Sequence, residues 1–337
     1  MNDNNSFFKK IIKALINIAI AIVTTITSIF ILNYLRLNIF YNLTKNNYSE
    51  FTEIPDLNIG YVPQGMCYVS SKNIILQTSY NDEASSRLYV FDYNRKELIC
   101  KFDLKDSSGH DIHSHVGGVA SNGNKVWICG DSTLYIYNLS EVLSSSENSI
   151  KSLKELTLNN SSDFCFYQYN KITNNPNESH YYNILWIGSF TVSLNPLSKP
   201  AIPLLYGYNL EKGDDITSIN NPDYTVAIPD KVQGLYIDTE NNFYFSRSYS
   251  GFLSSTIDIH ENILNSKTSE YLDNAKRIQY HDYRNTRRIR SIILPPMAEG
   301  IFIKDDKLYI IFESAAPKYH FVKPKINKIL ELKRGIE

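Results

Sequence analysis

Several polar side chains that can do chemistry stand at the start of short apolar strands, and most of them come directly before a glycine. Gln64-Gly65, Gln233-Gly234 and Glu299-Gly300 show the pattern most clearly, and Asp163 and His115 stand at or just before two further strand starts. A carboxylate such as Glu299 can bind a cationic amine or act as a general acid or base, and an imidazole or a second carboxylate can assist it. If the protein is an enzyme, we therefore expect Glu299, His115 and Asp163 to be its catalytic residues.

A second set of side chains follows the next strand along the chain, and these residues suit ligand binding. Arg247 can receive a carboxylate or phosphate through two parallel hydrogen bonds, although a pairing with Glu299 or Glu313 is an equally reasonable expectation. Tyrosine rings offer flat amphipathic surfaces that fit a sugar or a peptide. With the two glutamines included, we predict these ligand-binding residues: Gln64, Gln233, Arg247, Tyr80, Tyr249 and Glu313.

One loop gathers residues that metals favour. It contains His110, Asp111, His113 and His115, and two histidines one residue apart in an extended segment point to the same side. No second cluster in the sequence completes a tetrahedral set, so we predict no metal and no cofactor. A metal held by this loop together with Asp163 or Glu299 is the alternative. The four cysteines have no metal-like spacing and are interpreted mostly as small buried residues: Cys67, Cys100, Cys129 and Cys165.

The elements that must position these residues form a repeat of short strands, marked by apolar residues at two-residue spacing and by polar turns. The first strand of each unit covers residues 64–69, 117–119, 162–166, 233–237 and 299–303. The second covers 73–80, 125–130, 183–190, 242–249 and 307–314. The third covers 87–93, 133–139, 204–210, 255–261 and 328–334. The fourth covers 97–104, 153–158, 224–229 and 288–294.

The missing fifth member of the fourth class stands at the front of the repeat, where residues 50–57 resemble 224–230. This displacement predicts an all-β fold in residues 49–337: a five-bladed β-propeller closed by an N-terminal outer strand. A pair of β-sandwiches is the alternative, but it does not explain the displaced strand. The third unit carries a long insertion at 170–182, and the insertion at 262–287 is expected to hold a short helix outside blade four.

In a propeller the loops that enter the innermost strands open on one face. The polar residues named above should therefore ring one mouth of the central channel, with Arg247 and Glu313 on the rim above them. The glycines beside them have a structural interpretation, because inner strands crowd the axis and small residues permit close backbone approach. These glycines are Gly65, Gly117, Gly118, Gly234 and Gly300.

The N-terminal segment differs in composition from the rest. Residues 14–35 carry no charge and are rich in Ile, Leu, Val and Ala, and a helix of this length spans roughly 33 Å, enough to cross a bilayer. Lysines at 9, 10 and 13 precede it, which predicts a cytoplasmic N-terminus in 1–13, a single transmembrane anchor in 14–35 and an extracytoplasmic propeller after a linker in 36–48. A cleaved signal peptide and a buried core helix are the alternatives.

Overall charge and motif content exclude several function classes. The formal net charge is −1 and the pI is near 6.7, whereas a nucleic-acid-binding domain shows a basic surface. The sequence contains no nucleophile elbow, phosphate-binding loop or zinc-binding helix motif. We therefore expect the partners to be the membrane, through one helix, and a small ligand, with no nucleic acid.

Blade one carries a resemblance to a known family. VPQGM at 62–66, followed by RLYVFDYNRKELICKFDL at 87–104, resembles the glutamine cyclotransferases of the plant and bacterial type. The resemblance implies a five-bladed propeller and conversion of N-terminal glutamine to pyroglutamate. That family opens its second blade with Glu-Gly, where this sequence has Gly117-Gly118, and the Glu-Gly pair at an inner-strand start is Glu299-Gly300.

Two classes of function follow. The first is a membrane-anchored, extracytoplasmic propeller that binds a small polar ligand, glycan or peptide at its channel mouth. The alternative is an enzyme, either a glutaminyl-peptide cyclotransferase or a hydrolase, that uses Glu299 as acid or base. A buried Glu299 beside a polar partner favours the enzyme, and a Glu299 paired with Arg247 in an open funnel favours the binding module.

Overall fold

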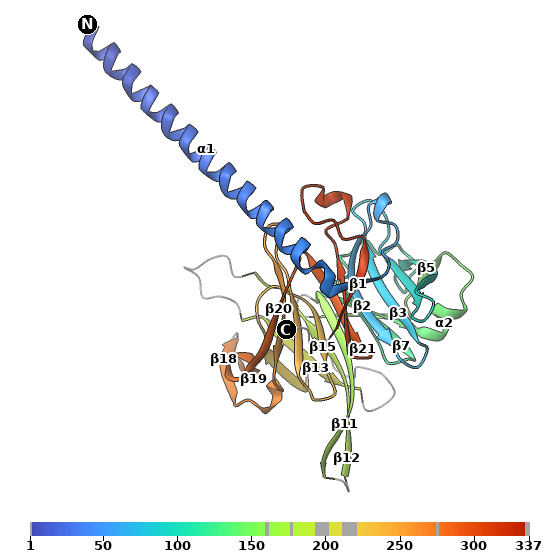
Figure 1. Ribbon diagram of the computed structural model, residues 1–337. Helices are drawn as coiled ribbons and strands as arrows, with labels where there is room; N and C mark the ends of the chain where they lie inside the picture. Colours follow the sequence, from blue (N-terminus) through green and yellow to red (C-terminus); the bar gives the residue numbers. More distant parts are fainter. Residues whose placement is uncertain are drawn as a thin grey trace.

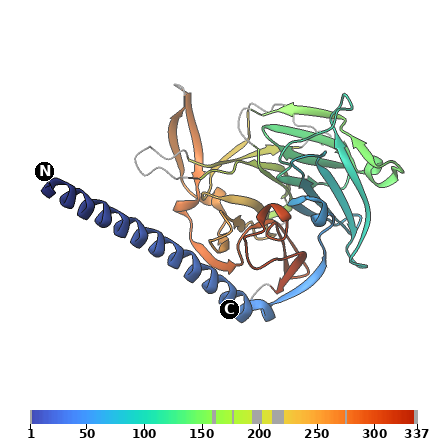
Figure 2. The same ribbon diagram turned by 90° about the horizontal axis from the view of Figure 1, so that it is seen from above.

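A computed structural model of the chain shows five β-sheets arranged around a central axis, with one long helix projecting from them (Figures 1 and 2). The structure describes residues 2–158, 162–175, 178–192, 202–210, 221–273 and 276–333. Each blade has its innermost strand at the axis and successive strands farther out. The predicted five-bladed propeller with one N-terminal apolar helix is therefore confirmed.

The first two blades follow the predicted order of strands. Blade one contains β2 (Val62–Val69), β3 (Ile74–Tyr80), β4 (Arg87–Asp92), β5 (Glu97–Lys105) and an added parallel strand, β9 (Ser149–Lys151). Blade two contains β6 (Gly118–Ser121), β7 (Lys125–Gly130), β8 (Thr133–Asn138) and β10 (Lys154–Thr157), with the short helix α2 (Leu139–Ser144) after β8.

The third and fourth blades carry the insertions. Blade three contains β11 (Phe164–Asn175), β12 (Glu178–Gly188), β13 (Leu204–Asn209), β14 (Tyr224–Ala227) and two added strands, β18 (Thr268–Asp273) and β19 (Lys276–Asp282). Blade four contains β15 (Val232–Ile237), β16 (Phe243–Arg247), β17 (Ser255–His260) and β20 (Arg288–Leu294). Short 3₁₀ turns lie at Lys45–Asn47, Leu57–Ile59, Ile263–Asn265, Tyr283–Asn285 and Pro317–Tyr319.

Blade five closes the ring. It contains β21 (Ala298–Lys304), β22 (Lys307–Phe312), β23 (Lys328–Lys333) and, as its outer strand, β1 (Tyr48–Glu53). β1 pairs antiparallel with β23 from Tyr48 opposite Leu332 to Glu53 opposite Lys328. The closure predicted from the displaced strand is confirmed, and it removes an open sheet edge that other chains could pair with.

Apolar side chains from neighbouring blades form the core. Every residue of β3 is buried, whereas the outer strand β5 exposes its first residues and buries Phe102 and Leu104. Trp127 and Trp186, on the second strands of blades two and three, are fully buried. Burial therefore decreases from the inner strands to the half-exposed outer strands, and the second half of β5 alternates between buried and partly exposed residues.

Glycines at the axis are required by close backbone approach, as predicted. A Cβ atom on Gly117 would lie 2.0 Å from the carbonyl oxygen of Asp163, and one on Gly300 would lie 2.5 Å from the backbone nitrogen of Met66. Neither contact is possible for a larger residue without movement of the backbone. The inner strands of adjacent blades therefore touch through their glycines.

The insertion at 262–287 differs from the expected helix. It forms the β18–β19 hairpin, and β19 pairs in parallel with β14, so it extends blade three instead of packing outside blade four. Residues 170–175 and 178–182 also belong to strands, because they continue β11 and β12, which pair over a long stretch (Figure 1).

The helix α1 runs from Asn2 to Thr44 and includes the whole apolar run 14–35. A stretch of 40 residues from Phe8 is long and apolar enough to cross a membrane. Residues 36–44, expected to belong to a flexible linker, continue the helix, and Leu37 is buried while Tyr41 packs against the core of blade five. The helix is therefore joined to the propeller by apolar contact as well as by the chain.

Candidate functional site

Three of the predicted site residues stand in β-bulges. The regular pairing of β2 with β3 is interrupted between Pro63 and Met66, that of β15 with β16 at Gln233, and that of β21 with β22 between Ala298 and Ile301. A bulge adds a residue to one strand and turns the local side chains away from the regular alternation. The sequence places a polar residue beside a glycine at each bulge, and this local geometry directs the polar residue to the channel mouth.

The mouth contains a cavity of about 300 Å³. It is lined by six of the predicted residues, namely Gln64, His115, Gln233, Tyr249, Glu299 and Glu313. The structure adds Phe190, Ser248, Ser250, Gly251, Phe252, Met297, Tyr319 and Phe321. Residues from four blades and from the loop before β6 therefore converge, as the topology of a propeller requires.

Glu299 is the most unusual group in this cavity. Its side chain is 1% exposed, and its Oε1 atom has no hydrogen-bond partner among the described residues. Burial, assisted by the nearby charge of Glu313, raises the pKa of Glu299 well above its ordinary value. A buried polar atom without a partner is costly, so the carboxyl group is best explained as one that protonates or meets a ligand.

Glu313 provides the second carboxylate. It follows β22, is 8% exposed, and lies 3.4 Å from the Nε2 atom of Gln64, measured from Oε2. Burial raises the pKa of Glu313 to about 7, against the opposing effects of hydrogen bonds from Tyr319 and Gln64 and of the charge on Lys318. Two buried carboxylates that influence each other titrate as a pair, so the pair keeps a proton to a higher pH than carboxyl groups in water do.

Polar rings that pack edge to face support one side of the site. The rings of Tyr80 and His115 are 3.8 Å apart, and the hydroxyl groups of Tyr80 and Tyr319 are 3.5 Å apart. Lys318 donates to the Tyr80 hydroxyl at 3.2 Å and pairs with Asp82. Packing of the ring lowers the pKa of His115 below its usual range, although part of the residue remains exposed. Its imidazole is therefore neutral near pH 7 and can accept or donate a hydrogen bond.

Three predicted site residues do not line the cavity: Tyr80, which contacts the lining residues His115 and Tyr319, together with Asp163 and Arg247. Asp163 accepts a hydrogen bond of 2.6 Å from the backbone nitrogen of Phe190, so it shapes the loop after β12. Arg247 pairs with Asp230 and, at 2.7 Å, with Asp258, instead of with Glu299 or Glu313. Both side chains satisfy neighbours on their own blade, which spacing along the sequence does not reveal.

The histidine loop does not assemble a metal site. His110 contacts Asp106 at 3.1 Å, and Asp111 pairs with Lys105 at 2.7 Å. Within the described ranges, no group of three or more His, Cys, Asp or Glu side chains is placed to hold a metal ion. The four cysteines are free thiols, with Cys129 and Cys165 buried and Cys67 and Cys100 partly buried.

Sequence reasoning missed the apolar part of the lining. Phe252 and Phe321 stack with ring centroids 5.6 Å apart, and Met297 adopts a left-handed backbone conformation with φ of 67° immediately before β21. A left-handed non-glycine residue is uncommon, and it stands two residues before Glu299. The one available signal was the exposed-loop motif Ser250-Gly251-Phe252, in which a large aromatic residue follows turn residues.

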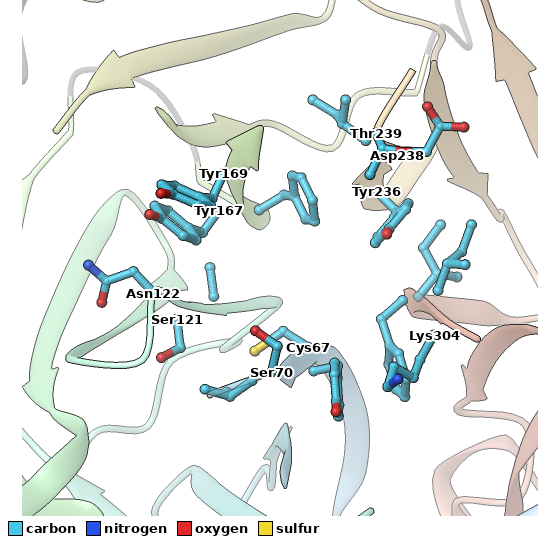
Figure 3. A pocket seen from close by; sticks show the side chains of 18 of the residues that line it. Cys67, Ser70, Ser121, Asn122, Tyr167, Tyr169, Tyr236, Asp238, Thr239 and Lys304 are labelled. Carbon is cyan, nitrogen blue, oxygen red and sulfur yellow. The ribbon is translucent and has the colours of Figure 1, made fainter. Parts of the chain in front are cut away.

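A second cavity, of about 710 Å³, lies at the opposite mouth of the channel, where the inner strands end. Figure 3 shows side chains from several blades around it, including Tyr167, Tyr236 and Lys304. Its charged groups are already satisfied: Lys304 pairs with Asp305, and Asp238 accepts hydrogen bonds from the segment that follows it. The smaller cavity is therefore the better candidate, because it contains the unsatisfied buried carboxylate.

Comparison with known proteins adds a resemblance of fold. No protein-family model and no curated protein matched the sequence. Among solved structures, the chain is similar to glutaminyl cyclase of Myxococcus xanthus, with 9% identity and a TM-score of 0.46 over 85% of this chain and 95% of that one.

Proposed function

We propose that this protein is a membrane-anchored propeller that binds a small ligand bearing a cationic amine at the cavity formed by Gln64, Gln233, Glu299 and Glu313. The observation that carries the proposal is the buried, unpartnered Oε1 atom of Glu299 beside a second buried carboxylate. Lysine and arginine are absent from the described residues that line the cavity. An ammonium group would supply the missing partner and the missing positive charge.

The remaining lining fits the rest of such a ligand. The amide groups of Gln64 and Gln233 can both donate and accept hydrogen bonds, and Tyr249, Phe252 and Phe321 provide aromatic surface. This combination suits a free amino terminus of a peptide or another small amine with polar substituents. The propeller faces the outside of the cell in this proposal, since the basic cluster precedes α1.

Catalysis at the same site is the second candidate. It is favoured by the burial of Glu299 and by the pairing of Arg247 with Asp230 and Asp258 instead of with Glu299, which is the arrangement expected of an enzyme. A carboxylic acid with a pKa raised toward neutrality can transfer a proton at physiological pH, and Glu299 and Glu313 both have raised pKa values. Such an enzyme would be a glutaminyl-peptide cyclotransferase or a hydrolase, with Glu299 as the acid or base and His115 at the rim. Incubation with peptides that begin with glutamine, followed by mass spectrometry for loss of ammonia, tests the first of these activities.

Binding is tested with the full-length protein in lipid nanodiscs. Short peptides with a free amino terminus should bind, measured by isothermal titration calorimetry, whereas the same peptides after N-terminal acetylation should not. Glu299→Gln keeps the shape of the side chain and removes its charge, so we expect at least a tenfold loss of affinity, which corresponds to about 1.4 kcal/mol. Equal binding of free and acetylated peptides would contradict the proposal.

Glu331→Gln is the matched control. Glu331 is also buried, but it pairs with Lys307 and Tyr309 in blade five and does not line the cavity. This variant should lose some stability and keep its affinity for the amine. A comparable loss of affinity in both variants would assign the effect to the fold and not to the site.

A further inference from the structure

The loop after β16 connects the candidate cavity to the N-terminal helix. The ring of Phe252, which lines the cavity, lies 5.2 Å from the ring of Phe30 in α1. The backbone carbonyl of the same residue accepts a hydrogen bond from the side-chain nitrogen of Asn33. Two contacts of different kinds thus fix this loop beside the helix.

The position of these contacts along α1 determines how deep the loop after β16 would lie relative to a bilayer that α1 crosses. Phe30 and Asn33 both belong to the uncharged run 14–35, and Phe30 stands five residues before its end at Leu35. At 1.5 Å per residue, Phe30 is about 7.5 Å inside the apolar run along the helix axis. If α1 spans a bilayer, a side chain in contact with Phe30 lies at the lipid interface and not in bulk water.

The residues around Phe252 form an exposed apolar patch, which we call the rim patch: Phe252, Leu253 and Phe321. Leu253 and Phe321 are each 48% exposed, and Phe252 stacks on Phe321. A Cβ atom on Gly251 would lie 2.1 Å from a methyl group of Val322, so the loops that carry the patch are packed together. The patch is therefore a preformed surface.

The rim patch is continuous with the apolar surface of α1. Ile26, Ile29 and Phe30 are about half exposed on the helix, and the patch meets them through the contact between Phe30 and Phe252. Figure 1 shows the helix leaving the propeller on the side opposite to the tip of the β11–β12 hairpin. Aromatic residues are enriched where membrane proteins meet the headgroup layer. Continuity with a membrane-spanning surface favours lipid as the occupant over a soluble partner.

We propose that the rim patch inserts into the outer leaflet, so that the mouth of the Glu299 cavity lies at the membrane surface. This inference rests on the membrane anchoring in the proposed function and specifies how the site is approached. A ligand then reaches Glu299 and Glu313 from the headgroup layer. The larger cavity at the opposite mouth faces away from the membrane.

The test uses fluorescence of the full-length protein in phosphatidylcholine vesicles that contain brominated acyl chains. Leu253→Trp places a fluorophore in the patch, and Tyr169→Trp, at the opposite mouth, is the matched control because Tyr169 is 61% exposed. The native Trp127 and Trp186 are fully buried and contribute the same background to both variants. We expect brominated lipid to quench the added signal of Leu253→Trp at least threefold more than that of Tyr169→Trp.

A second variant and a flotation assay distinguish a patch that does not contact lipid from a protein that is not anchored in the membrane. Phe321→Trp replaces one exposed aromatic residue by another and should show the same quenching. If the protein floats with the vesicles but neither patch variant is quenched more than the control, the patch does not touch lipid and this inference is wrong while the anchor stands. If the protein does not float with the vesicles, the anchoring itself is wrong.

Discussion

At the scale of single residues, the candidate site is defined by two buried carboxyl groups, and the Oε1 atom of Glu299 has no hydrogen-bond partner among the described residues. Glu299 and Glu313 share one small cavity whose described lining contains no lysine or arginine, whereas the buried acids Asp258 and Asp282 have arginine partners. Paired carboxylates stay ionised, but like charges in a shared cavity raise each other's cost of ionisation. The lining therefore prefers one proton or one cation between its two glutamates.

This preference predicts a pH dependence of stability. The folded-state pKa of Glu313 is raised to about 7 and that of Glu299 is raised well above its ordinary value, so the folded protein holds protons that the unfolded chain releases above pH ~4.5. The contribution of these two carboxyl groups to stability should be greatest below that pH and should fall as pH rises through 7. The free energy of unfolding, measured in urea between pH 5 and 8, should fall less steeply for Glu313→Gln than for the parent protein.

Gln64, Lys318 and Tyr319 also face Glu313 and must be considered with it. They lower its pKa, so Lys318→Met should raise the pKa and shift the decline in stability to higher pH. Identical slopes for the parent protein and Glu313→Gln would show that this carboxyl group titrates normally.

The sequence predicted part of this site. Gln64, Gln233 and Glu299 were found because a polar residue before a glycine at a strand start is a local pattern with one structural cause, the bulge at the axis. Asp163 and Arg247 had equally suitable chemistry, but their partners, the backbone of Phe190 and the carboxylates of Asp230 and Asp258, are set by loop geometry within a blade. The spacing of residues along the sequence does not reveal side-chain partners of this kind.

At the scale of elements, the order of strands was predictable and the outer additions were not. The alternation in each blade and the displaced strand β1 gave the correct topology. The segments that became β9 and β19 pair with β5 and β14, which are far away in the sequence, and such pairing depends on an edge that exists only after the blade has formed. The helical continuation to Thr44 was missed because it is stabilised by packing of Leu37 and Tyr41 on the propeller.

Closure by β1 predicts a large effect of one aromatic side chain. Phe51 is 6% exposed and packs on Tyr309 and Tyr93, with ring centroids 5.0 and 5.4 Å away. It thus joins blade five to blade one. Phe51→Ala should cost about 3–5 kcal/mol of unfolding free energy, measured by urea denaturation. Leu98→Ala, on the exposed outer part of blade one, should cost less than about 1 kcal/mol; similar losses in the two variants would mean that closure contributes little.

At the scale of the whole molecule, the two mouths of the channel are not equivalent. One holds the buried glutamates and lies beside α1, and the other is wider and is bordered by the β11–β12 hairpin. The helix is packed on blade five instead of being attached by a free tether. A fixed helix gives the propeller a defined orientation relative to any membrane that α1 crosses, and this orientation decides which mouth faces lipid.

The direction in which α1 crosses the membrane is the last prediction. Three lysines precede the apolar run, whereas Arg36 follows it and Lys45 stands farther on, so the propeller should lie outside the cytoplasm. Ser6→Cys and Ser144→Cys make the same substitution on the two sides of the helix, and Ser144 is exposed on α2. In intact cells a membrane-impermeant maleimide should label Ser144→Cys above the parent protein and should label Ser6→Cys only after permeabilisation. Replacing Lys9, Lys10 and Lys13 by glutamine should weaken this difference in labelling, because the basic cluster sets the orientation. Labelling of Ser6→Cys alone in intact cells would show the opposite orientation, with the Glu299 cavity against the inner leaflet.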